Sequence, residues 1–104
     1  MAYYLFKLIP PRPTFNVDMS EEERAVMKAH SAWWREQAES GKAIAVGPVL
    51  DPAGVWGVAI CELKDDEDPE AFTAGDPVKT KGLGFRYEGH RMPAIILRGG
   101  SGQG

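Results

Sequence analysis

Residues 55–63, "VWGVAICEL", form a short apolar run that decides the architecture expected for this chain. Its length and its β-branched residues predict a strand. Alternate residues of a strand face opposite sides of its sheet. One side carries Val55, Gly57, Ala59 and Cys61, and the other carries Trp56, Val58 and Ile60. Both sides are apolar, whereas a half-solvated strand alternates apolar with polar residues, so we expect both faces of this strand to be covered.

Further elements extend outward from this strand in both directions. Residues 2–10 and 42–50 predict strands, the second of them broken at Gly47-Pro48, and between them a helix begins at Ser20 and ends near Ser40. Residues 10–19, "PPRPTFNVDM", predict a stiff loop. After the strand at 55–63, short helices follow Asp68 and Asp76, each of which precedes a proline. Residues 84–98 predict a fourth strand, a turn at Gly89 and a last apolar strand.

The resulting order, β-α-β-β-α-β plus an end strand, predicts an α+β fold of the ferredoxin-like sandwich type with an extra C-terminal strand. We expect one domain over residues 1–98 and a flexible tail over residues 99–104, "GGSGQG". The helices would cover one face of the sheet. The apolar second face of the strand at 55–63 then predicts a homodimer packed sheet to sheet.

Composition excludes several classes of function. A net charge of −3 gives no basic field for nucleic acid, and no apolar run approaches the ~20 residues of a membrane span. The single Cys61 cannot form an internal disulfide, which favours a cytoplasmic location. Two His and one Cys, widely spaced, give no metal-ligand pattern, and no phosphate- or dinucleotide-binding motif is present. We therefore expect no metal and no cofactor.

His30 lies within "MKAHSAWWREQ", residues 27–37 of the long predicted helix. At about 100° per residue, it falls on the apolar side with Val26 and Trp34, whereas Ser31 and Arg35 fall on the other side. His30 should therefore point toward the sheet. Two interpretations stay open: a core histidine bonded to a backbone carbonyl, or the working group of a site.

Several stretches of the chain together resemble the YCII-related (YciI-like) family. They are "LIPPRPTF", "HSAWWREQAESGKAIAVGPVLDPAGVWGV", "AGDPVKTKGLGFRYE" and "MPAIILR", which span nearly the whole chain. The resemblance implies a ferredoxin-like subunit in a dimeric α+β barrel. It also implies a pocket that holds a histidine from the first helix and an aspartate from the "DP" turn, here His30 and Asp76. One branch of the family is a dehydrochlorinase of a chlorinated hydroxyquinol.

A carboxylate bonded to one imidazole nitrogen fixes the tautomer and makes the other nitrogen a better base. We therefore expect His30 and Asp76 to form an acid–base pair, although Asp76 before Pro77 is also an ordinary helix cap. No nucleophile is evident, because Cys61 is expected within the sheet. The chemistry favoured is proton abstraction, elimination or isomerisation of a small aromatic or carbonyl compound.

Other residues are candidates for binding that compound. Arg12 lies between prolines on a loop and can clamp an anion, or is a solvated loop arginine. Trp34 walls an apolar pocket or is core, and Gly47-Pro48 is a bulge that opens room for a ligand or only a bend. Tyr87 alternates with Arg86, so one of the two faces the helices. The competing function is a non-catalytic domain for ligand binding or assembly, in which His30 only makes hydrogen bonds.

Overall fold

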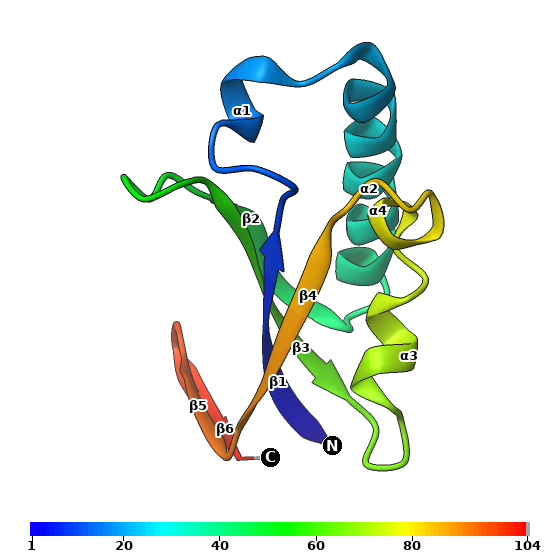
Figure 1. Cartoon of the computed structure of the whole chain (residues 1–104). Helices are drawn as coiled ribbons and strands as arrows, with labels where there is room; N and C mark the ends of the chain where they lie inside the picture. Colours follow the sequence, from blue (N-terminus) through cyan, green and yellow to red (C-terminus); the bar gives the residue numbers. More distant parts are fainter. Residues whose placement is uncertain (104) are drawn as a thin grey trace.

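Four strands pair side by side in the order β2-β3-β1-β4, and all three pairings are antiparallel. The strands are β1 (Ala2–Ile9), β2 (Ala43–Val49), β3 (Trp56–Leu63) and β4 (Arg86–Met92). The computed structural model describes residues 1–103, and in it the helices α2, α3 and α4 lie on one side of this sheet (Figure 1). The predicted α+β fold class is confirmed.

The long helix α2 (Glu21–Glu39) begins with the capping box predicted from the sequence. The Ser20 hydroxyl accepts a hydrogen bond from the Glu23 N–H at 3.1 Å, and the Glu23 carboxylate accepts one from the Ser20 N–H at 2.9 Å. The predicted caps of α3 (Pro69–Thr73) and α4 (Pro77–Thr80) are also present, with Asp68 and Asp76 each bonding the second N–H of its helix. These bonds satisfy backbone donors that a helix start leaves unpaired.

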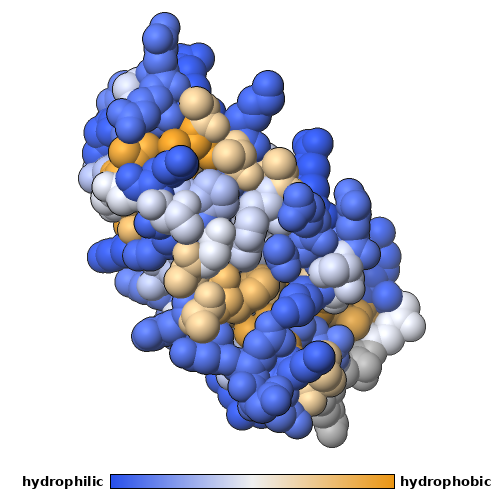
Figure 2. Space-filling model, turned by 90° about the vertical axis from the view of Figure 1, so that its right-hand side faces the viewer, coloured by the Kyte–Doolittle hydropathy of each residue, from blue (hydrophilic) through white to orange (hydrophobic). Residues whose placement is uncertain are grey.

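The core lies between α2 and the sheet and consists of two clusters. The first contains Phe6, Trp34, Ala43, Ala59, Cys61 and Leu63, and the second contains Leu8, Phe15, Val26, Val78 and Phe85. Full burial of a side chain such as Phe6 contributes roughly 1.5–3 kcal/mol. The outer surface that carries the helices is mostly polar and is interrupted by apolar areas (Figure 2).

Gly89 does not form the turn predicted for it, because β4 runs through it without interruption. A Cβ atom at this position would lie 3.1 Å from Cε1 and 3.3 Å from Cδ1 of Phe6, its partner on β1. Glycine is therefore required by the close approach of an aromatic ring, which local sequence does not reveal.

Gly47-Pro48 does not break β2, which was the second incorrect expectation. β2 is an edge strand of the sheet, where a proline without an N–H is tolerated. The irregularity in its pairing with β3 lies earlier, between Ala43 and Ala45.

Two segments contain more regular structure than expected. The loop at residues 10–19 includes a short helix, α1 (Phe15–Asp18), which buries Phe15 against Phe85. The C-terminal apolar strand, β5 (Ala94–Leu97), pairs with β6 (Gly100–Gln103) in a separate two-stranded sheet and does not join the main sheet. Most of the expected flexible tail at residues 99–104 therefore belongs to β6, while Gly104 lies outside the described residues.

Candidate functional site

His30 and Asp76 are 46 residues apart in the chain and form a direct hydrogen bond in the fold. The His30 Nδ1 atom lies 2.8 Å from Oδ2 and 2.9 Å from Oδ1 of Asp76. α2 presents His30 toward the sheet, as its helical spacing predicted, and the side chain is only 13% exposed. The Asp76 side chain is fully buried.

Asp76 is the N-cap of α4, and its carboxylate is surrounded by hydrogen-bond donors. The Val78 N–H donates to Oδ1 at 3.1 Å, which is the capping bond. The Trp34 indole N–H donates to Oδ2 at 3.0 Å, and the Tyr87 hydroxyl donates to the same oxygen. With His30, four donors converge on one carboxylate. These four bonds hold the carboxylate in one position.

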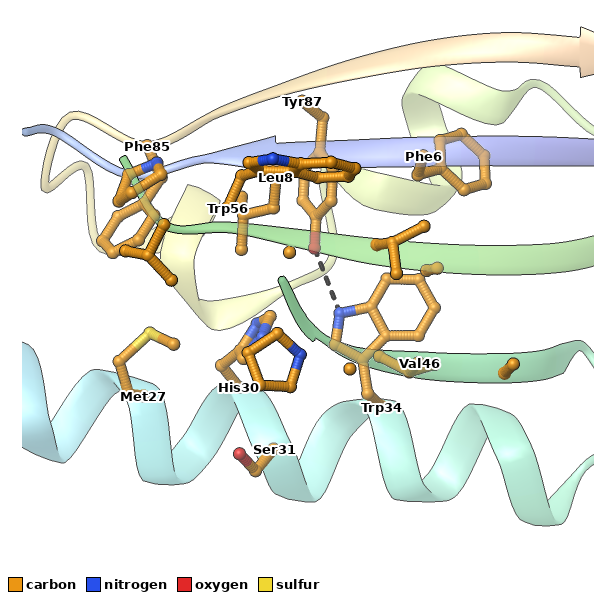
Figure 3. A pocket seen from close by; sticks show the side chains of 18 of the residues that line it. Phe6, Leu8, Met27, His30, Ser31, Trp34, Val46, Trp56, Phe85 and Tyr87 are labelled. Atoms are coloured by element: carbon orange, nitrogen blue, oxygen red, sulfur yellow. Dashed lines mark hydrogen bonds between the residues drawn. The ribbon is translucent and has the colours of Figure 1, made fainter. Parts of the chain in front are cut away.

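Trp34 and Tyr87 are also bonded to each other, since the indole N–H lies 3.0 Å from the Tyr87 hydroxyl oxygen. Figure 3 shows His30 and Trp34 pointing from α2 toward the sheet and Tyr87 pointing back toward the helix. Burial, followed by the charge of Asp76 and the hydrogen bond to it, raises the pKa of the Tyr87 hydroxyl above its ordinary value. Tyr87 therefore stays protonated and donates to Asp76 over the whole physiological pH range.

The contact with Asp76 selects one tautomer of neutral His30. The carboxylate only accepts hydrogen bonds, so the Nδ1 atom carries the proton and the Nε2 atom carries a lone pair. Within residues 1–103, Nε2 has no hydrogen-bond partner. The ring is therefore held at one nitrogen and available at the other, which is the arrangement that a general base requires.

A cavity of about 550 Å³ lies beside this histidine, between α2 and the strands β2 and β3. This volume is within the range of small-molecule sites, about 300–1,000 Å³. The lining is mostly apolar, and Ile44 and Val46 of the edge strand β2 are 39% and 41% exposed at its rim. Figure 3 shows part of the lining, including Phe6, Leu8, Met27, His30, Trp34, Trp56, Phe85 and Tyr87.

Most of the candidate binding residues line this cavity. Trp34, Gly47, Pro48 and Tyr87 do so, and Tyr87 rather than Arg86 is the residue of β4 that faces the helices. A Cβ atom at Gly47 would meet nothing within 4 Å, so the glycine leaves open space there.

Arg12, the remaining candidate, is not among the residues that line this cavity. Its guanidinium bonds the Asp18 carboxylate at 2.7 Å and both Glu23 oxygens at 2.7 and 2.9 Å. It lines a separate surface hollow together with Pro11 and Pro13 of the proline-rich loop. Two carboxylates of its own chain thus occupy Arg12, which ties the loop to the start of α2.

Sequence reasoning placed Ser31 and Arg35 on the wrong side of α2, since both residues line the cavity. The cavity lies along the flank of the helix that faces β2, not under its centre. Its helical wall consists of Met27, His30, Ser31, Trp34, Arg35 and Ala38. The three-to-four-residue spacing of these residues is typical of one side of a helix. Predicting that this side lines a cavity would have required knowing which side of α2 the sheet leaves uncovered.

Cys61 is fully buried in β3, and burial raises the pKa of its thiol to about 12. It therefore stays a neutral thiol. Cys61 lies within the sheet, as expected from the sequence. Among residues 1–103, no three His, Cys, Asp or Glu side chains lie together in a way that could hold a metal ion.

The fold and the site together define a class: a small α+β domain in which a buried histidine–aspartate pair borders an open apolar cavity. The sequence model of the YCII-related domain matches residues 2–92, and the chain belongs to that family. A search of the curated proteins found no match. No helix in the described part of the chain is long and apolar enough to cross a membrane.

Proposed function

We propose that this protein is a cofactor-free acid–base enzyme that acts on a small aromatic or carbonyl compound. His30 is the base and Asp76 orients it. The observation that carries the proposal is the pairing of Nδ1 with a fully buried carboxylate, while Nε2 has no partner in the described chain. A core histidine needs partners for its polar atoms, but it does not need a cavity of about 550 Å³ beside it.

In the proposed reaction, Nε2 removes a proton from a carbon of the bound compound. Asp76 then stabilises the imidazolium that forms, without accepting the proton itself. The same proton is returned to another atom in an isomerisation, or passes to the departing group in an elimination. The apolar lining excludes water and strengthens the attraction between imidazolium and the carbanion or enolate.

Proton abstraction can be tested before the substrate is known. Small aromatic and carbonyl compounds with an acidic C–H bond are incubated with the protein in D2O, and loss of each C–H signal is followed by NMR. We expect exchange or product formation for at least one compound. Because general base catalysis contributes about 10²–10⁴-fold, His30→Gln should lower the rate at least about 100-fold.

Asp18→Asn serves as the matched control, because this carboxylate lies outside the cavity and should leave the exchange rate unchanged. Nitrogen-15 NMR of the imidazole rings gives an independent readout. His30 should be in the Nδ1–H tautomer and lose that preference in Asp76→Asn, while the exposed His90 is unaffected. If no compound exchanges faster than in His30→Gln, the alternative function, non-catalytic binding of a small ligand, replaces this one.

We also propose that two copies of the chain pair through the sheet in the ferredoxin-like manner, forming a dimeric α+β barrel. The support is the face of the sheet away from α2, where Leu5 pairs with Ile60 on β3 and Val58 lies two residues from Ile60. All three side chains are half-buried in the single chain. Analytical ultracentrifugation should show a dimer for the native protein and a monomer for Ile60→Lys. A native monomer would contradict the proposal.

A further inference from the structure

The permanent charge that lines the cavity is positive. Arg35 is the only permanently charged residue among those that line it in the described chain, and no Asp or Glu is among them. The carboxylate that bonds His30, Asp76, is fully buried and already accepts four hydrogen bonds. The chain as a whole has a net charge of −3, so the charge that lines the cavity is opposite in sign to the net charge of the chain.

Arg35 also differs from the arginines that form ion pairs with carboxylates of the chain. Arg12 is held by Asp18 and Glu23, and Arg86 lies 3.6 Å from Glu88. Within residues 1–103, Arg35 forms no ion pair, although Glu36 and Glu39 lie close to it in sequence. Its planar group of five donors is therefore available to a ligand that enters the cavity.

Ser31 adds a neutral donor next to this cation. It precedes Arg35 by four residues on α2, which places the two side chains on adjacent turns of the same helix flank. Both line the cavity and both are exposed at its opening. A guanidinium that bonds a carboxylate in a two-pronged manner, with a hydroxyl beside it, makes a compact anion-binding group.

The spacing along α2 sets the size of the ligand. His30 and Arg35 are separated by five residues, or about 7.5 Å along the helix axis. Because both residues line the cavity, a ligand held at Arg35 through its anion can extend along the cavity to the His30 ring. The remaining walls are apolar and include Met27, Leu8 and Phe85, which suit an aromatic or branched aliphatic body.

We propose that the cavity binds small carboxylic acids with one apolar group, anchored through the carboxylate by Arg35 and Ser31. This inference rests on the proposed function for its orientation, since it directs a carbon of the bound acid toward His30 Nε2. The apolar group then fills the space between α2 and the sheet.

Matched acids and amides test the anchor. Phenylacetate, 3-phenylpropanoate and isovalerate are titrated into the isotope-labelled protein, each against its neutral amide of equal shape. We expect at least one acid to bind about 10- to 100-fold more tightly than its amide, the range that one charge-assisted hydrogen bond provides. Arg35→Gln should lower the affinity for that acid to the level of the amide, and leave the amide affinity within about twofold of the native value.

Arg24→Gln is the control, because it removes the same charge from an exposed position of α2 that does not line the cavity. It should leave both affinities within about twofold of native. The proposal is overturned if every acid and its amide bind equally, if no acid binds saturably, or if Arg24→Gln weakens acid binding as much as Arg35→Gln.

Failure of the anchor and failure of the acid–base function give different results. If the preference for acids depends on Arg35 while no compound exchanges its C–H protons, the anchor stands and the enzyme proposal fails. If His30-dependent exchange is found but no acid is preferred over its amide, the enzyme proposal stands and the anchor fails. Acid binding should also persist in His30→Gln, because the anchor lies on Arg35.

Discussion

α2 and α4 each begin with a carboxylate that bonds a backbone N–H of its own helix start. At α2, Glu23 bonds the Ser20 N–H and then meets the guanidinium of Arg12. At α4, Asp76 bonds the Val78 N–H and then meets the imidazole of His30. An arginine is a permanent cation, so the first pair only ties a loop to a helix. A histidine has a second nitrogen, so the second pair leaves one ring nitrogen without a partner in the described chain, on a side chain that lines the cavity.

Burial sharpens this contrast. Glu23 is 11% exposed, but its partner Arg12 is 35% exposed, and ion pairs open to water stabilise a fold less because water and salt screen them. Asp76 is completely buried, and all of its partners lie in the core or at the cavity. Removing a buried carboxylate therefore leaves several donors without water to replace it. A capping carboxylate thus ties a loop to a helix at the start of α2, whereas at the start of α4 it holds together the side chains of the candidate site.

The largest expected effect separates the two helix starts by stability. Asp76→Ala should lower the free energy of unfolding by about 3–5 kcal/mol, because it leaves buried donors unpaired and removes the cap of α4. Glu23→Ala should change it less, because its partner Arg12 is partly exposed and can be solvated by water. Urea denaturation monitored by tryptophan fluorescence measures both. Equal losses for the two variants would contradict the distinction between an organising and a local carboxylate.

A smaller effect is expected from Tyr87→Phe, which keeps the ring but removes the hydroxyl between Asp76 and Trp34. The loss of two hydrogen bonds in a partly buried network should cost about 1–2 kcal/mol. The indole N–H signal of Trp34 should shift in the NMR spectrum. The indole of Trp56, which bonds Asp51, is an internal control and should stay in place; a shift of both would indicate a general change of fold.

The smallest effect concerns the pH dependence at the start of α2. Hydrogen bonds from Arg12, and then from the Ser20 backbone, lower the pKa of Glu23 to about 2. An unfolded glutamate has a pKa near 4.3, so the unfolded chain binds the extra proton first as pH falls. The stability from Glu23 is therefore complete above about pH 5 and is lost as pH falls toward 2.

Glu23→Gln isolates this contribution, because the amide oxygen can still accept the Ser20 N–H while the charge is gone. The variant should show a shallower loss of thermal stability between pH 5 and pH 2 than the native protein. Thermal unfolding followed by circular dichroism across that range measures the difference. An unchanged acid slope would mean that the Arg12–Glu23 pair does not contribute to acid sensitivity.

Local patterns in the sequence predicted the parts of the fold that local physics controls. The capping box at Ser20 and the caps at Asp68 and Asp76 were found where they were predicted. The orientation of His30 followed from the helical period. The turn predicted at Gly89 was wrong because glycine is needed there to leave room for the ring of Phe6, which is distant in sequence.

The site was predictable only in part. The resemblance to the YCII-related family paired His30 with Asp76, and strand alternation left Tyr87 or Arg86 to face the helices. The bonds that join Asp76 to Trp34 and Tyr87 depend on how α2, α4 and β4 meet, and no local pattern encodes that meeting. Ser31 and Arg35 were misplaced because the position of the cavity depends on which flank of α2 the sheet leaves open.

The hydrogen bonds around Asp76 also determine when the site can form during synthesis of the chain. Trp34 and Tyr87 are separated by 53 residues, so their contact forms only after residue 87 has been synthesised. A ribosome releases α2 and the β2–β3 hairpin long before it releases β4. Until Tyr87 emerges, His30 and Asp76 lack a donor that holds the carboxylate in place. The site is therefore complete only when β4 joins the sheet. A chain truncated before residue 87 would contain His30 and Asp76 without the hydrogen bonds from Tyr87.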